Sequence, residues 1–93
     1  MEKRDKKDAM DKFLRELEDI KNSQVAVLKK IAQIEADNIN AGVQILDKSL
    51  PDVHEYADKT VENITQIEND LQNFRDDFVK KNNLNAEPEV VAP

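Results

Sequence analysis

Apolar residues in the first half of the chain recur at alternating steps of three and four, and this spacing limits the fold more than any other feature. The ladder begins at Met10 and continues for five heptads with two polar members, Gln24 and Asn38. Only an α-helix returns to one face every 3.5 to 3.6 residues, so the ladder predicts a long helix with an apolar stripe. Its members are Met10, Phe13, Leu17, Ile20, Gln24, Val27, Ile31, Ile34, Asn38, Ala41 and Ile45.

A second ladder with the same spacing begins at Ala32 and ends at Phe78. Where the two ladders overlap, between about residues 25 and 46, the helix is apolar over a wide arc. One partner helix covers only a narrow stripe, so this segment predicts at least two neighbouring helices. The residues that widen the arc are Val25, Leu28, Ile39 and Leu46.

Composition supports an all-α fold of one small domain. The chain has 93 residues, of which 37% are charged, with one glycine and no cysteine. Scarce glycine speaks against a barrel or sandwich, which needs many tight turns, whereas a high charged fraction is typical of long helices. Without cysteine there are no disulfides, thiolate metal sites or thiol nucleophiles.

The place where the chain reverses depends on Pro51. The second ladder passes through this residue without losing phase, as one long kinked helix would. An interior proline costs about 3 kcal/mol, however, whereas a proline in a first helical turn costs little. Ser49 and Asp52 also have capping-box spacing, with aspartate in place of the usual Glu or Gln. We therefore predict a turn at 49–51 between helices 5–48 and 52–81. The alternatives are one long kinked helix, a break at 37–42 where asparagines and the lone glycine could end a helix, and a three-helix bundle.

The predicted helices differ in length. Residues 1–4 are expected to be flexible, and 82–93 to form a disordered acidic tail. Helix 5–48 would then extend beyond helix 52–81, and its first apolar residues would lack a partner within the chain. Leaving a large apolar side chain exposed forgoes about 1.5–3 kcal/mol, so we expect another chain to cover them. The predicted fold is a long, coiled-coil-like antiparallel helical hairpin that forms a homodimeric helical bundle or binds a helical protein partner.

Two sets of residues follow from this fold as candidate functional positions. A buried polar residue in an apolar ladder can fix register and partner number, which predicts that role for Gln24 and Asn38. Replacing Asn38 with isoleucine should then raise stability. The predicted partner-binding residues are Met10, Phe13, Leu14, Leu17, Val25, Leu28, Ile39 and Leu46.

The sequence offers little that points to catalysis. His54-Glu55-x-x-Asp58 has the spacing of the zincin motif His-Glu-x-x-His, with aspartate replacing the second histidine. Because the chain has no other histidine and no cysteine, the remaining ligands would all be carboxylates. We expect no metal, cofactor or small-molecule substrate, an exposed His54 beside a helix start, and a protein that is not an enzyme.

Charge is distributed unevenly along the chain. The net charge is −6, with +2 on residues 1–30 and −8 on residues 31–93. This asymmetry suits antiparallel self-packing or a basic partner and disfavours direct nucleic-acid binding, which needs a concentrated basic surface. Without a signal peptide or an apolar run long enough to span a bilayer, a cytoplasmic, soluble protein with no membrane contact is expected.

These observations favour a helical adaptor that acts through coiled-coil association. One alternative is a small acidic inhibitor, or nucleic-acid mimic, that binds a basic cleft through carboxylates of the second half. Another is a secretion chaperone or exported hairpin. The length resembles the small hairpins of type VII secretion, but their Trp-x-Gly turn is missing because the chain has no tryptophan. The carboxylates of the acidic alternative are Asp52, Glu55, Asp58, Glu62, Asp70, Asp76 and Asp77.

Overall fold

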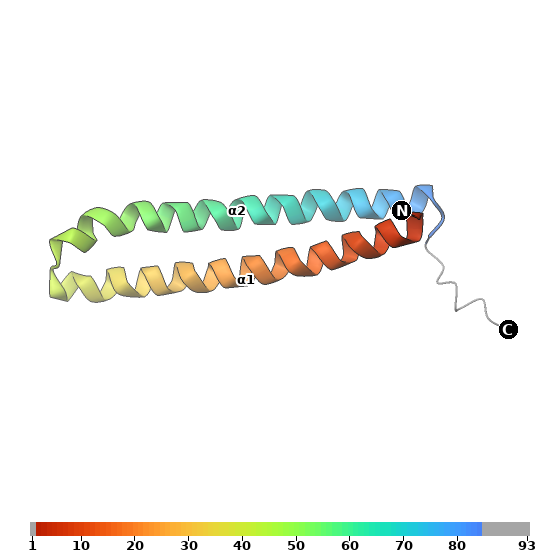
Figure 1. Cartoon of the computed structure of the whole chain (residues 1–93). Helices are drawn as coiled ribbons and strands as arrows, with labels where there is room; N and C mark the ends of the chain where they lie inside the picture. Colours follow the sequence, from red (N-terminus) through yellow and green to blue (C-terminus); the bar gives the residue numbers. More distant parts are fainter. Residues whose placement is uncertain (1, 85–93) are drawn as a thin grey trace.

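Two long antiparallel helices make up the protein, as the computed structural model shows for residues 2–84 (Figure 1). Helix α1 spans Lys3–Ala41 and helix α2 spans Gln44–Lys81. At 1.5 Å per residue, each helix is about 58 Å long. The predicted all-α helical hairpin is confirmed.

The reversal lies at Gly42 and Val43, so the predicted turn at 49–51 is wrong. Gly42 has φ 65° and ψ 34°, in the left-handed region that a side chain disfavours. Its N–H donates to the Asn38 carbonyl at 2.8 Å and thereby ends α1. The break at 37–42 was therefore the better alternative, because only the glycine supplies the positive φ that this turn requires.

Pro51 lies inside α2, in the third turn of the helix, and does not start a helix. Its nitrogen has no hydrogen to donate to the Asp47 carbonyl, which is why proline bends helices. In Figure 1 the beginning of α2 is tilted relative to the rest of the helix. Helix continuity through this residue explains why the second ladder keeps its phase there.

The two helices are nearly equal in length, with 39 residues in α1 and 38 in α2, so the predicted overhang of the first helix does not exist. Met10, expected to lack an intrachain partner, is only 4% exposed. Residues 3 and 4, expected to be flexible, belong to α1. Helix α2 ends at Lys81 as predicted, whereas residues 85–93 of the predicted tail lie outside the described residues.

The helices meet along a narrow seam whose members follow the four–three spacing of a heptad repeat. Two helices side by side cannot enclose their contact residues, and most of these remain half-buried. The α1 seam residues are Met10, Leu14, Leu17, Lys21, Gln24, Leu28, Ile31, Glu35 and Asn38. The α2 seam residues are Leu50, His54, Ala57, Val61, Ile64, Glu68, Leu71, Arg75 and Phe78.

Candidate functional site

The apolar ladders supply the seam with only half of their members. In α1 every second ladder residue, such as Met10 or Ile31, packs in the seam. The residues between them stay exposed, and α2 follows the same pattern. Within α1 and α2, seven large apolar side chains are left with exposed fractions between 37% and 54%. They are Phe13, Ile20, Val27 and Ile34 of α1, and Val53, Ile67 and Phe74 of α2.

These seven residues lie on one side of the hairpin. Each comes one position before a seam residue, so all are rotated by the same angle away from the seam. An antiparallel helix pair has a local two-fold axis perpendicular to the plane that contains both helices. Rotation about this axis exchanges the two helices but does not exchange the two sides of the hairpin. Equivalent positions of α1 and α2 therefore lie on the same side. Together with the half-buried Thr60, which has the same spacing in α2, the seven residues define a surface that we call the apolar face.

Thr60 fits this face despite its hydroxyl group. Its Oγ1 donates a hydrogen bond of 2.9 Å to the Tyr56 carbonyl of the preceding turn. Since the hydroxyl is satisfied within α2, its methyl group can contact an apolar partner without leaving a polar group unpaired.

Two ion pairs between the helices fix their register and therefore the order of residues along the face. Lys21 Nζ lies 2.9 Å from Glu68 Oε1, and His54 Nδ1 lies 2.6 Å from Glu35 Oε1. Because the helices are antiparallel, the positions just before two paired seam residues move apart by one residue each and lie within about 3 Å of the same level. The face therefore has four layers, which are Phe13 with Phe74, Ile20 with Ile67, Val27 with Thr60, and Ile34 with Val53.

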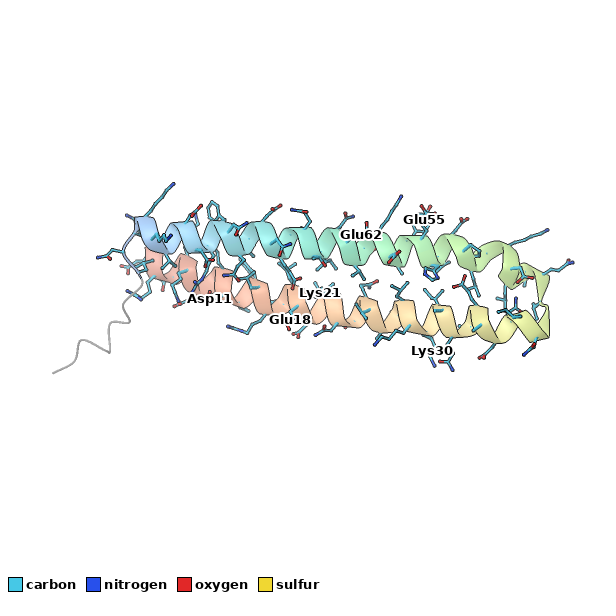
Figure 2. The ribbon with its side chains drawn as sticks, turned by 180° about the vertical axis from the view of Figure 1, so that it is seen from behind. Asp11, Glu18, Lys21, Lys30, Glu55 and Glu62 are labelled. Carbon is cyan, nitrogen blue, oxygen red and sulfur yellow. The ribbon has the colours of Figure 1, made fainter. Side chains whose placement is uncertain are left out.

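The opposite side of the hairpin, which we call the polar face, carries the interhelical ion pairs. The paired seam residues lie one position, about 100°, beyond members of the apolar face. A third pair joins Asp11 Oδ1 to Arg75 Nε at 2.8 Å. Figure 2 shows Asp11 and Lys21 on the side of α1 that faces α2, whereas Lys30 and Glu55 project outward. The charged seam residues therefore lie toward the side of the hairpin opposite the apolar face.

Electrostatics on the polar face follow from these contacts. The hydrogen bond to Glu35 raises the pKa of His54 above its ordinary value. Burial alone would raise the pKa of Asp11, but hydrogen bonds from Lys7 and Arg75 outweigh that effect and lower the pKa. His54 is thus a partner of α1, where the sequence predicted an exposed histidine beside a helix start.

The Asn38 side chain forms hydrogen bonds with residues at the turn of the same chain. Its Nδ2 donates to the Val43 carbonyl at 3.1 Å and to Asp47 Oδ1 at 2.8 Å, and its Oδ1 accepts from the Val43 N–H at 2.8 Å. Asn38 is 4% exposed, and the contacts described for it are internal to the hairpin. Gln24, the other residue predicted to set register, is half-buried in the seam.

The predicted partner-binding residues do not share one surface. Phe13 lies on the apolar face, whereas Met10, Leu14, Leu17 and Leu28 pack in the intrachain seam. The remaining three lie elsewhere. Val25 is half-buried on the polar side of α1, Leu46 is half-buried beside the turn, and Ile39 is 81% exposed near the end of α1.

Sequence reasoning did not single out most of the apolar face. Ile20, Val27 and Ile34 were ladder members but not predicted contact residues, and the α2 half was not predicted at all. The signal was present in the residues that follow them. Lys21, Glu35 and Glu68 are charged although they directly neighbour apolar ladder positions, which indicates that the apolar stripe is turned partly away from the seam.

A basic side chain lies over the aromatic rings at one end of the apolar face. Lys6 Nζ lies 5.8 Å from the ring centroid of Phe74 and 5.4 Å from that of Phe78. The two rings are stacked, with centroids 6.5 Å apart. Cation–π contacts of this kind favour a charged residue over aromatic rings even at an exposed site.

Within residues 2–84, no three His, Cys, Asp or Glu side chains gather closely enough to bind a metal ion. Neither of the two described helices combines the length and apolarity needed to cross a bilayer. Comparison of the chain with protein-family models, curated proteins and solved structures found no match.

Proposed function

We propose that this chain is a non-enzymatic helical interaction protein that acts by association through its apolar face. One observation carries the proposal. Seven large apolar side chains repeat at heptad spacing along one side of the hairpin, each between 37% and 54% exposed. Contiguous exposed apolar surface rimmed by polar residues is characteristic of protein-interaction sites.

The energetic argument concerns what the fold leaves uncovered. Fully burying a large apolar side chain contributes about 1.5–3 kcal/mol, and each face residue realises only part of that in the isolated hairpin. Polar residues such as Ser23 and Asn63 flank the face, so the apolar stripe has defined edges. A helical partner of complementary apolar surface would bury the remaining area, which gives an adaptor function a physical basis.

Affinity capture from an extract of the protein's own cells tests this function. The bait variants would be Ile20→Glu/Ile67→Glu on the face and, as a matched control, Ile39→Glu/Ile45→Glu off the face. Both control residues are more exposed than the face residues, at 81% and 70%. We expect the wild type and the control to capture the same partner at low and at high salt, because salt does not screen apolar contacts. A second copy of this chain counts as such a partner. Loss of capture by the control as well as by the face variant would contradict the proposal.

The acidic-inhibitor alternative is supported by a different observation. All seven carboxylates of that alternative are exposed and lie on α2, which carries nine Asp/Glu and five Lys/Arg. A basic target held by these groups should dissociate as salt rises, because exposed charge pairs are screened. A partner that the face variant still captures at low salt, but that high salt releases, would favour this second function.

A further inference from the structure

We infer that the apolar face binds a second copy of this chain, giving an antiparallel four-helix bundle in which the turns of the two hairpins lie at opposite ends. This inference rests on the proposed function and names the partner of its face. It follows from the direction of the apolar stripes, from the size of the face, and from the side chains that a two-fold axis would bring together.

The apolar stripe of each helix is not centred on the sister helix. A hairpin that needed no partner would have both of its alternating seam positions apolar. Here one set of seam positions includes Lys21, Glu35, His54 and Glu68, and the apolar residues shift to the opposite flank. Each stripe therefore points between the sister helix and the space above the apolar face. Helices in a four-helix bundle have this arrangement because each packs against two neighbours.

The face is large enough for a stable homodimer. Its residues span about 32 Å along each helix, and two adjacent helices are together about 20 Å wide, which gives an outline of about 640 Å² per copy. This area lies within the roughly 600–1,000 Å² per partner of a standard protein interface. A two-fold interface uses the same patch on both copies, so the patch must be complementary to itself. The four layers of the face meet this condition in one orientation.

Side-chain size favours turns at opposite ends. With the axis at the middle of the face, the Phe13 and Phe74 layer meets the partner's Ile34 and the partner's Val53. The Ile20 and Ile67 layer then meets the partner's Val27 and the partner's Thr60. Large residues thus face smaller ones throughout, which fills a core evenly. Turns at the same end would instead place four phenylalanines in one layer and two valines with two threonines in another.

Charge at the rim of the face favours the same orientation. The axis that matches side-chain sizes brings Glu16 level with the partner's Lys30, and symmetry repeats this opposite-charge pair. The α2 acids beside the face, Asp70 and Asp77, come level with the partner's Tyr56 and the partner's Ser49. In the other orientation Glu16 would be level with the partner's Asp70, which places like charges together and opposes binding.

Sedimentation equilibrium of the pure, unmodified chain tests whether the partner is a second copy. We expect the mass of two chains at micromolar concentration for the wild type and for the off-face control Ile39→Glu/Ile45→Glu. The face variant Ile20→Glu/Ile67→Glu should dissociate to one chain or lose helicity by circular dichroism. A folded wild-type chain of single mass, or any assembly other than two chains, would overturn the inference.

A single spin label at Asn40 tests the orientation without touching the face. The chain has no cysteine, so Asn40→Cys provides one attachment site, and Asn40 is exposed. Opposite turns place the two labels about 50 Å apart, whereas adjacent turns place them about 20 Å apart. A distance near the shorter value would overturn the proposed arrangement.

The two proposals can fail separately. If the pure chain stays monomeric and folded while the extract yields a partner that depends on Ile20 and Ile67, the second-copy inference fails and the proposed function stands. If neither the chain itself nor any other protein binds in a face-dependent way, both fail.

Discussion

At the scale of single residues, the turn depends on Gly42 and Asn38, which act together on the last turn of α1. Gly42 adopts the left-handed conformation that ends the helix, and Asn38 connects that end to the start of α2 through three side-chain hydrogen bonds. Val43, the N-cap of α2, makes no side-chain capping hydrogen bond. The reversal therefore relies on one residue's conformational freedom and another residue's amide group.

Replacing Gly42 with alanine should lower the free energy of unfolding by about 1 kcal/mol, because a side chain disfavours positive φ by about that amount. A Cβ there would meet no atom within 4 Å, so the loss would arise from the backbone conformation and not from a clash. Urea denaturation measures the loss, and Gly42→Asn, which tolerates this conformation better, should lose less. A stability gain in Gly42→Ala would contradict this view of the turn.

Replacing Asn38 with isoleucine should reduce stability, which reverses the expectation from sequence alone. Each lost hydrogen bond is worth about 0.5–1.5 kcal/mol, and isoleucine replaces none of the three that Asn38 makes. The unfolding free energy from urea denaturation should therefore fall by more than about 1 kcal/mol. If the variant were more stable than the wild type, the hydrogen bonds of Asn38 would not be what stabilises the turn.

His54 should make stability depend on pH near neutrality. Because the Glu35 hydrogen bond raises the pKa of His54 in the folded state, its stabilising effect is complete below the unfolded-state pKa of about 6.5. The effect is lost as the pH rises through the higher folded-state pKa. The thermal midpoint of the wild type should therefore fall as the pH rises above about 6.5, and Glu35→Gln should remove most of that fall. An equal fall in both proteins would assign the pH dependence to other groups.

At the scale of helices, α1 and α2 are held in register by charge as well as by packing. The Lys21–Glu68 and His54–Glu35 pairs occupy seam positions where a self-sufficient hairpin would carry apolar residues. Ion pairs specify which residues may face each other, because a shifted register would bring like charges together. Helix α2 also remains packed against α1 despite the bend at Pro51.

Exchanging the charges of one pair tests this role in register. Lys21→Glu should lower the thermal midpoint because two carboxylates would then face each other, and Lys21→Glu/Glu68→Lys should recover most of the loss. The decrease in thermal midpoint caused by Lys21→Glu should be smaller at high salt, because both side chains are partly exposed and salt screens their charges. Lys30→Glu provides the matched control, because Lys30 projects outward in Figure 2. A double variant no better than Lys21→Glu alone would show that the pair does not specify register.

At the scale of the whole molecule, sequence periodicity predicted the helices and their excess of apolar surface, but it did not predict which ladder members would face which way. Seam and face positions, such as Leu17 and Ile20, are equally apolar, so only the charged seam residues distinguish them. The turn was misplaced because Pro51 is a stronger helix-breaking signal than Gly42. The α2 helix nevertheless continues through Pro51, whereas the chain reverses at Gly42, where the residue has a positive φ.

The central claim is that this hairpin exposes more apolar helical surface than it can bury alone. Thermal unfolding of the unmodified chain, followed by circular dichroism over roughly a hundredfold range of chain concentration, tests that claim most directly. If the folded state contains two chains, dilution should lower the midpoint steadily. A cooperative transition whose midpoint does not change with concentration would show that a single hairpin is stable without a partner.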